Sequence, residues 1–131
     1  APEAVRINAS RVLEGVTGGR GESGVRLIKA WADDLPSWKD VHDWKWCARF
    51  GYQVIKKRGV GGAGFRWIYR DFLREAETLS PRLSELKLSD KMDRIGEKWS
   101  EAADLLKEIS ERGKPEKSLL KKASQTAANI Y

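Results

Sequence analysis

The chain is poor in cysteine and histidine: Cys47 and His42 are each the only residue of their type among 131. One cysteine excludes an internal disulfide, and one cysteine with one histidine cannot build a Cys₂His₂ or Cys₄ zinc site. We therefore expect no metal site. The lack of disulfides agrees with a reducing cytoplasm.

Long apolar segments are also missing. No apolar run approaches the ~20 residues that a helix needs to span a bilayer, and residues 1–15 lack the apolar core of a signal peptide. Both absences predict a cytoplasmic chain that does not contact membranes. The length of 131 residues predicts a single helical domain over residues 1–131, and the start at Ala1 instead of methionine fits an excised fragment or a processed end.

Residue types that carry catalysis are sparse and poorly placed. His42 precedes Cys47 by five residues, so the two do not share a helical face, and a nucleophile needs an aligned base. The acidic residues form neither a catalytic carboxylate pair nor a calcium loop. We therefore expect no catalytic residue here, and no acyl transfer or thioester hydrolysis by this chain alone.

What the chain does have is helical periodicity. Hydrophobic residues make up 40% of the sequence and include six tryptophans, and no segment alternates with the two-residue period of a strand. These patterns predict an all-α fold, a single compact bundle of about six helices. We expect helix boundaries near Pro36, Gly59–Gly64, Ser80 and Gly113, where prolines, glycines and caps interrupt the periodicity.

Finer features of the helices follow from the same patterns. Ser37 and Ser89 are the expected N-caps of two helices, and Trp31, Trp38 and Trp44 are expected in the core. Two segments carry apolar residues at i, i+3, i+4 and i+7, which predicts the faces that pack inward. The first stripe is Val5, Ala9, Val12, Leu13 and Val16, and the second is Phe65, Ile68, Tyr69, Phe72, Leu73, Ala76 and Leu79.

A glycine-rich segment precedes the second stripe, with four glycines between Gly59 and Gly64. Its spacing is neither a dinucleotide fingerprint nor a P-loop, so we expect no nucleotide cofactor. A helix that begins there presents unpaired N–H groups and a positive dipole end, which favour an anion such as phosphate. The alternative is a close helix–helix turn in which Arg66 forms an internal salt bridge. The residues of the candidate anion site are Arg58, Gly59, Gly61, Gly62, Gly64, Arg66, Tyr69 and Arg70.

The chain has a formal net charge of +6, and Lys56 to Arg70 contains five basic residues and no acidic one. This patch suits an acidic partner such as nucleic acid, a carrier protein or a phosphate group, although a solvated basic face is the alternative. Trp46 and Trp67 lie off the apolar stripes of their helices. We expect both tryptophans to be exposed and to form part of an interface.

The glycine segment and the helix after it resemble the signature R-G-x-G-G-x-x-F-R-x-x-Y-x-x-F-L-x-E-A. This signature belongs to the helical C-terminal domain of butirosin-biosynthesis-H-like proteins. The resemblance implies an N-terminal domain of the same protein, related to papain-like cysteine peptidases, that carries acyl-transfer chemistry. It also implies an acyl-carrier protein or a phosphopantetheine thioester as a further partner. The matching residues are Arg58, Gly59, Gly61, Gly62, Phe65, Arg66, Tyr69, Phe72, Leu73, Glu75 and Ala76.

From this resemblance we expect a helical accessory domain that positions a substrate or partner for an acyltransferase and does not catalyse alone. Two other functions stay open. A basic helical module could bind nucleic acid, although no helix-turn-helix pattern is clear. A purely structural domain could instead bury its tryptophan face against a partner.

Overall fold

The computed structural model describes residues 2–15, 24–57 and 63–131, and these residues form helices and no strand. The prediction of an all-α fold is therefore confirmed for the described part of the chain. Seven of the elements are α-helices, η1 is a 3₁₀ helix and η2 is a π-helical turn. Their bounds are α1 Pro2–Glu14, α2 Arg26–Asp34, η1 Leu35–Asp40, α3 Trp44–Tyr52, η2 Gln53–Lys57, α4 Ala63–Leu79, α5 Pro81–Leu86, α6 Leu88–Glu111 and α7 Lys117–Ala128.

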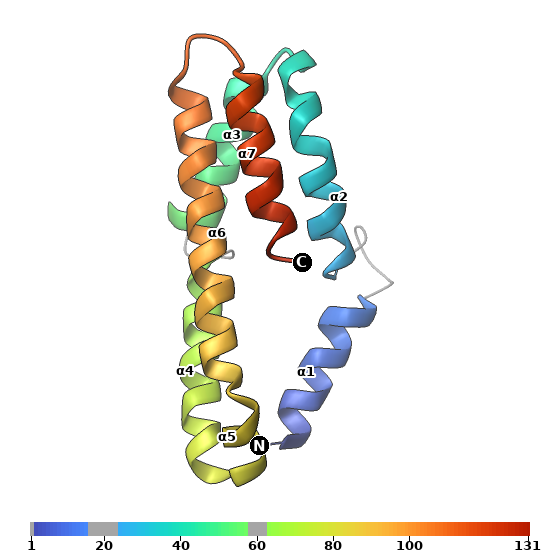
Figure 1. Cartoon of the computed structure of the whole chain (residues 1–131), viewed down its shortest axis with the longest axis vertical. Helices are drawn as coiled ribbons and strands as arrows, with labels where there is room; N and C mark the ends of the chain where they lie inside the picture. The colour runs from blue at the N-terminus through green and yellow to red at the C-terminus, as the bar shows by residue number, and fades with distance from the viewer. Residues whose placement is uncertain (1, 16–23, 58–62) are drawn as a thin grey trace.

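Helix α6 is the longest of the described helices and packs against α4, α3 and α7 (Figure 1). Its N-terminal half packs against α4, and its C-terminal half packs against α3 and α7. Helix α2 and the turn η1 complete the bundle by packing on α7. Each half of α6 therefore meets a different set of helices.

The main core lies where α2, η1, α3, α6 and α7 meet. Leu35, Leu106, Ile109 and Leu120 are its largest fully buried side chains, and each contributes about 1.5–3 kcal/mol by leaving water. Four partly buried tryptophans pack against this core. They are Trp31, Trp38, Trp44 and Trp99, which confirms the prediction for the first three.

The two expected serine caps are wrong. Ser37 lies inside η1, where its hydroxyl donates to the carbonyl oxygen of Asp34 at 2.7 Å, and the following α-helix begins only at Trp44. Pro36 lies in the first turn of η1, where its missing N–H group is tolerated. The chain therefore continues as a 3₁₀ helix through Ser37, and no new helix begins there. Ser89 lies inside α6, one residue after its start at Leu88.

Helix α1 carries its apolar stripe on the surface. None of its residues is buried, and Ile7, Val12 and Leu13 are exposed, so the expectation that this stripe packs inward is wrong. Val16, the last member of that stripe, lies outside the described residues. Among the described helices, none is both long enough and apolar enough to cross a bilayer.

Candidate functional site

Helix α4 turns its most apolar face outward, and this is the main correction to the sequence-based expectations. Of the predicted inward stripe, only Leu73 and Ala76 are buried, at 2% and 3% exposure. Phe65, Ile68 and Leu79 are 53%, 65% and 74% exposed, and Phe72 is also exposed. We refer to Phe65, Ile68, Phe72 and Leu79 as the outer face of α4.

The opposite face of α4 meets α6 through arginine and tryptophan side chains. The guanidinium of Arg66 lies 4.1 Å from the ring centroid of Trp99 on α6. Trp99 in turn stacks on Trp31 of α2, with ring centroids 5.6 Å apart and ring planes 8° apart. Burial lowers the pKa of Arg66 below the usual guanidinium value. These contacts connect α4 to the main core through an aromatic column.

Trp67 also faces α6, so the expectation that it is exposed is wrong. It is half-buried, and its ring packs against Gly96 so closely that a Cβ built on Gly96 would lie 2.7 Å from a ring atom. The guanidinium of Arg70 lies 5.0 Å from the Trp67 ring centroid. Glycine at position 96 thus permits the close approach of α4 and α6.

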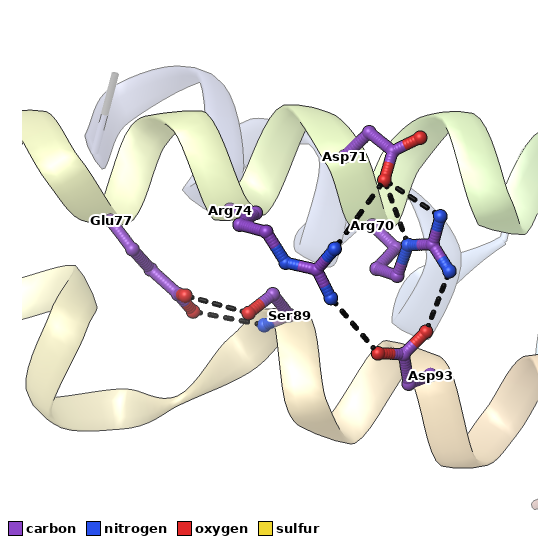
Figure 2. Close-up of polar contacts among 6 residues, drawn as sticks. All are labelled: Arg70, Asp71, Arg74, Glu77, Ser89 and Asp93. Carbon is purple, nitrogen blue, oxygen red and sulfur yellow. Dashed lines mark hydrogen bonds and ion pairs between the residues drawn. The ribbon is translucent and has the colours of Figure 1, made fainter.

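Arg70 and Arg74 of α4 both contact the same two carboxylates, Asp93 on α6 and Asp71 on α4 (Figure 2). Asp93 of α6 accepts from Arg70 at 2.8 Å and from Arg74 at 3.1 Å. Asp71 lies 2.7 Å from Arg70 and 4.0 Å from Arg74. Hydrogen bonds to Asp93 and then to Asp71 raise the pKa of Arg70. The charges of Arg70 and Arg74 are therefore compensated by Asp93 of α6 as well as by Asp71 of α4, and the pattern of α4 alone does not reveal the contribution of Asp93.

One turn further along, the carboxylate of Glu77 caps α6. The two oxygens accept from the backbone N–H of Ser89 at 2.9 Å and from its hydroxyl at 2.6 Å (Figure 2). The first N–H groups of a helix have no partner within the helix, so a carboxylate from α4 supplies what a local cap would otherwise supply. The same hydrogen bonds lower the pKa of Glu77.

The predicted anion site falls partly outside the described residues: Arg58, Gly59, Gly61 and Gly62 lie there, whereas Gly64 is in the first turn of α4. Tyr69 is half-buried and stacks on Phe72, and burial raises the pKa of its hydroxyl. Arg66 and Arg70 face Trp99 and Asp93 as described above. Anion binding at this place stays a prediction.

Trp46 is 64% exposed, as expected, and stacks on Phe50 with ring centroids 5.0 Å apart. Its interface role stays a prediction. His42 is fully exposed, whereas Cys47 is half-buried. In the described part of the chain, no three His, Cys, Asp or Glu side chains are grouped as metal ligands would be.

Comparison with known protein families extends this description to the whole sequence. The profile of a domain of unknown function, DUF4872, matches residues 1–131. The chain belongs to the DUF4872 family. No curated protein and no solved structure matches this DUF4872 domain. The family description names no activity, ligand or partner and contains no link to butirosin biosynthesis, so that resemblance stays a proposal.

Proposed function

We propose that this DUF4872 domain is a non-catalytic accessory domain that docks against another domain through the outer face of α4. The observation that carries the proposal is the exposure of Phe65, Ile68, Phe72 and Leu79 along a single helix. Scattered exposed apolar residues are ordinary, but a row of large ones on one helix is typical of an interaction surface.

The contacts on the other side of α4 support this proposal, because they fix the rotation of the helix. A rotation of α4 about its axis that buried Ile68 would break three contacts. They are the stacking of Arg66 on Trp99, the ion pair of Arg70 with Asp93 and the cap from Glu77. The outer face is therefore held toward solvent by three specific contacts. Burying Phe65 or Ile68 in an interface would contribute about 1.5–3 kcal/mol per side chain.

The resemblance to butirosin-biosynthesis-H-like proteins suggests the partner. It is the cysteine-peptidase-like domain of the same protein, which would carry an acyltransferase activity with an acyl-carrier protein or phosphopantetheine thioester as donor. In this proposal the helical domain positions a substrate or partner, and the cytoplasm, which suits a chain with one cysteine, is its location.

A binding experiment tests the docking proposal. The isolated chain is titrated into the separately produced cysteine-peptidase-like domain, and the dissociation constant is measured by calorimetry. We expect Ile68→Asp to weaken binding at least about tenfold, which corresponds to about 1.4 kcal/mol. Val41→Asp is the matched control, because Val41 is an exposed aliphatic residue between η1 and α3. Equal binding by Ile68→Asp and wild type, or no binding by wild type, would contradict the proposal.

The predicted anion site belongs to the same proposal as a second contact point, for the phosphate of a pantetheine arm. It is supported by the start of α4 at Ala63, within the glycine segment Gly59–Gly64, because a helix N-terminus attracts anions. We expect inorganic phosphate to raise the melting temperature saturably and Arg66→Ala to abolish the rise. A rise without saturation, or none, would speak against the site.

Nucleic-acid binding gains less support from the structure. Lys56 pairs with Asp104 and Arg70 pairs with Asp93, so these two charges of the segment from Lys56 to Arg70 are compensated within the fold. Affinity for generic duplex DNA that falls steeply with salt would support the nucleic-acid alternative over domain docking.

A further inference from the structure

A cavity of about 470 Å³ lies between α1, α4 and α6. Most of its described lining comes from α1, and α4 and α6 supply the rest. The lining residues are Asn8, Ala9, Val12, Leu13, Tyr69 and Met92. No outer-face residue of α4 is among them, so the described lining is separate from the proposed docking surface.

Helix α1 is attached to the start of α2 at its C-terminal end. The backbone N–H of Val25 donates to the carbonyl oxygen of Val12 at 3.1 Å, and Arg26 donates to that of Glu14 at 3.4 Å. Gly24 permits this close approach, because its φ is 109° and a Cβ there would lie 3.0 Å from the same Val12 oxygen. No residue of α1 is buried, so the helix lies beside α4 and α6 without filling the space between them (Figure 1).

The chemistry of the lining suits an uncharged aliphatic molecule. Met92 has an unbranched, adaptable side chain that fits apolar groups of irregular shape. None of the described lining residues is charged, so a carboxylate, phosphate or ammonium group inside the cavity would lose its hydration without compensation. The amide of Asn8 and the hydroxyl of Tyr69 are the polar side-chain groups of this lining, which matches a ligand with one polar group.

The cavity also leaves apolar side chains in contact with water. Val12 and Leu13 are 53% and 63% exposed although both line it. Removing such side chains from water is favourable. A ligand in the cavity would cover apolar surface of α1, α4 and α6 at once and would thereby connect α1 to the bundle.

We propose that this cavity binds an uncharged aliphatic molecule, such as a medium-length alkyl chain with one terminal hydroxyl, and that α1 forms one wall of the site. The volume lies within the range of small-molecule sites. The proposal does not depend on docking through α4, because the isolated chain supplies all three helices that line the cavity.

A set of matched probes tests the proposal. Met92 is the only methionine of the chain, so its ε-methyl group gives one NMR signal that reports on the cavity. With ¹³C-methyl-labelled methionine, we expect 1-octanol to shift this signal saturably. 1-Hexanol should bind about tenfold more weakly, because it buries two fewer methylene groups. Octanoate, which has the same chain length and a charged end, should also bind at least about tenfold more weakly than 1-octanol.

A substitution that fills the cavity gives an independent control. Ala9 lines the cavity and is exposed, so the fold accommodates Ala9→Phe, which should reduce 1-octanol affinity at least about tenfold. Ala4→Phe is the matched control, because Ala4 is also an exposed alanine of α1 and is not among the described lining residues. It should bind as wild type.

Absence of a saturable shift of the Met92 signal would overturn the proposal. So would equal affinities for 1-octanol and octanoate, or 1-octanol binding that Ala9→Phe leaves unchanged.

Discussion

Glu77 stabilises a helix other than its own, and its charge is what makes the contact effective. Both of its oxygens accept hydrogen bonds from Ser89 at the start of α6. We expect Glu77→Gln to lower the unfolding free energy by about 1 kcal/mol, the usual cost of losing a helix cap. Urea unfolding of Glu77→Gln, with Glu75→Gln on the same helix as the matched control, measures this cost. A loss no larger than that of the control would contradict this role.

The pH dependence of stability gives a second test of the same carboxylate. The pKa of Glu77 in the folded chain lies below its ordinary value of 4.5, because hydrogen bonds from Ser89 favour the charged form. The stabilisation is therefore complete above 4.5 and is lost as the pH falls through the lower folded-state pKa. The stability difference between wild type and Glu77→Gln should shrink over this acid range. A difference that stays constant with pH would exclude the carboxylate as its cause.

Gly96 is the residue whose lack of a side chain the α4–α6 contact needs. Alanine in a helix normally gains about 1 kcal/mol over glycine. Here three ring atoms of Trp67 lie between 2.7 and 3.0 Å from the position of the new Cβ, and overpacking costs about 1–3 kcal/mol. We expect Gly96→Ala to lower the melting temperature. Gly113→Ala, where nothing lies within 4 Å of the Cβ, should leave it almost unchanged. Equal melting temperatures for both variants would contradict the close approach.

At the scale of the element, α4 shows where a sequence pattern misleads. Its apolar stripe predicts that Phe65, Ile68 and Phe72 face the core, yet the helix packs through Arg66, Trp67 and Arg70. The partners that decide this rotation are on α6, among them Asp93 and Gly96, and only the tertiary structure places them opposite α4. Hydrophobic periodicity shows which face of a helix is apolar, but it does not show whether that face packs in the core or is exposed.

The ion pairs between α4 and α6 should contribute measurably to stability, because they are only partly exposed. The side chains of Arg70 and Asp93 are 23% and 31% exposed. We expect Asp93→Asn to lower the free energy of unfolding, since it leaves Arg70 and Arg74 with less compensation. Asp33→Asn is the control: its partner Lys29 is well exposed, and exposed pairs contribute little to stability. A double-mutant cycle of Asp93→Asn with Arg70→Met should show a coupling energy outside the error of the measurement. Additive effects would rule out a direct contribution of the pair.

At the scale of the whole molecule, the sequence predicts the class and the helix boundaries well. Helix α2 ends just before Pro36, α4 begins within the glycine segment, Ser80 precedes α5, and α6 ends just before Gly113. These boundaries are set by local backbone chemistry, which the sequence displays directly. The cap at Ser37 fails because the chain forms the 3₁₀ helix η1 there, and the cap at Ser89 fails because α6 begins earlier and the carboxylate of Glu77 bonds its first turn. The cavity between α1, α4 and α6 could not be predicted, because these helices create it together.

Hydrogen exchange tests most directly whether the outer face of α4 docks against another domain. Amide exchange of residues 65–79 is compared between the isolated chain and a longer polypeptide in which the proposed cysteine-peptidase-like domain precedes it. Docking would suppress local opening, so we predict that these amides exchange at least about tenfold more slowly in the longer polypeptide. The amides of α7, which packs inside the bundle, should exchange alike in both. Equal exchange of residues 65–79 in the two polypeptides would contradict the account.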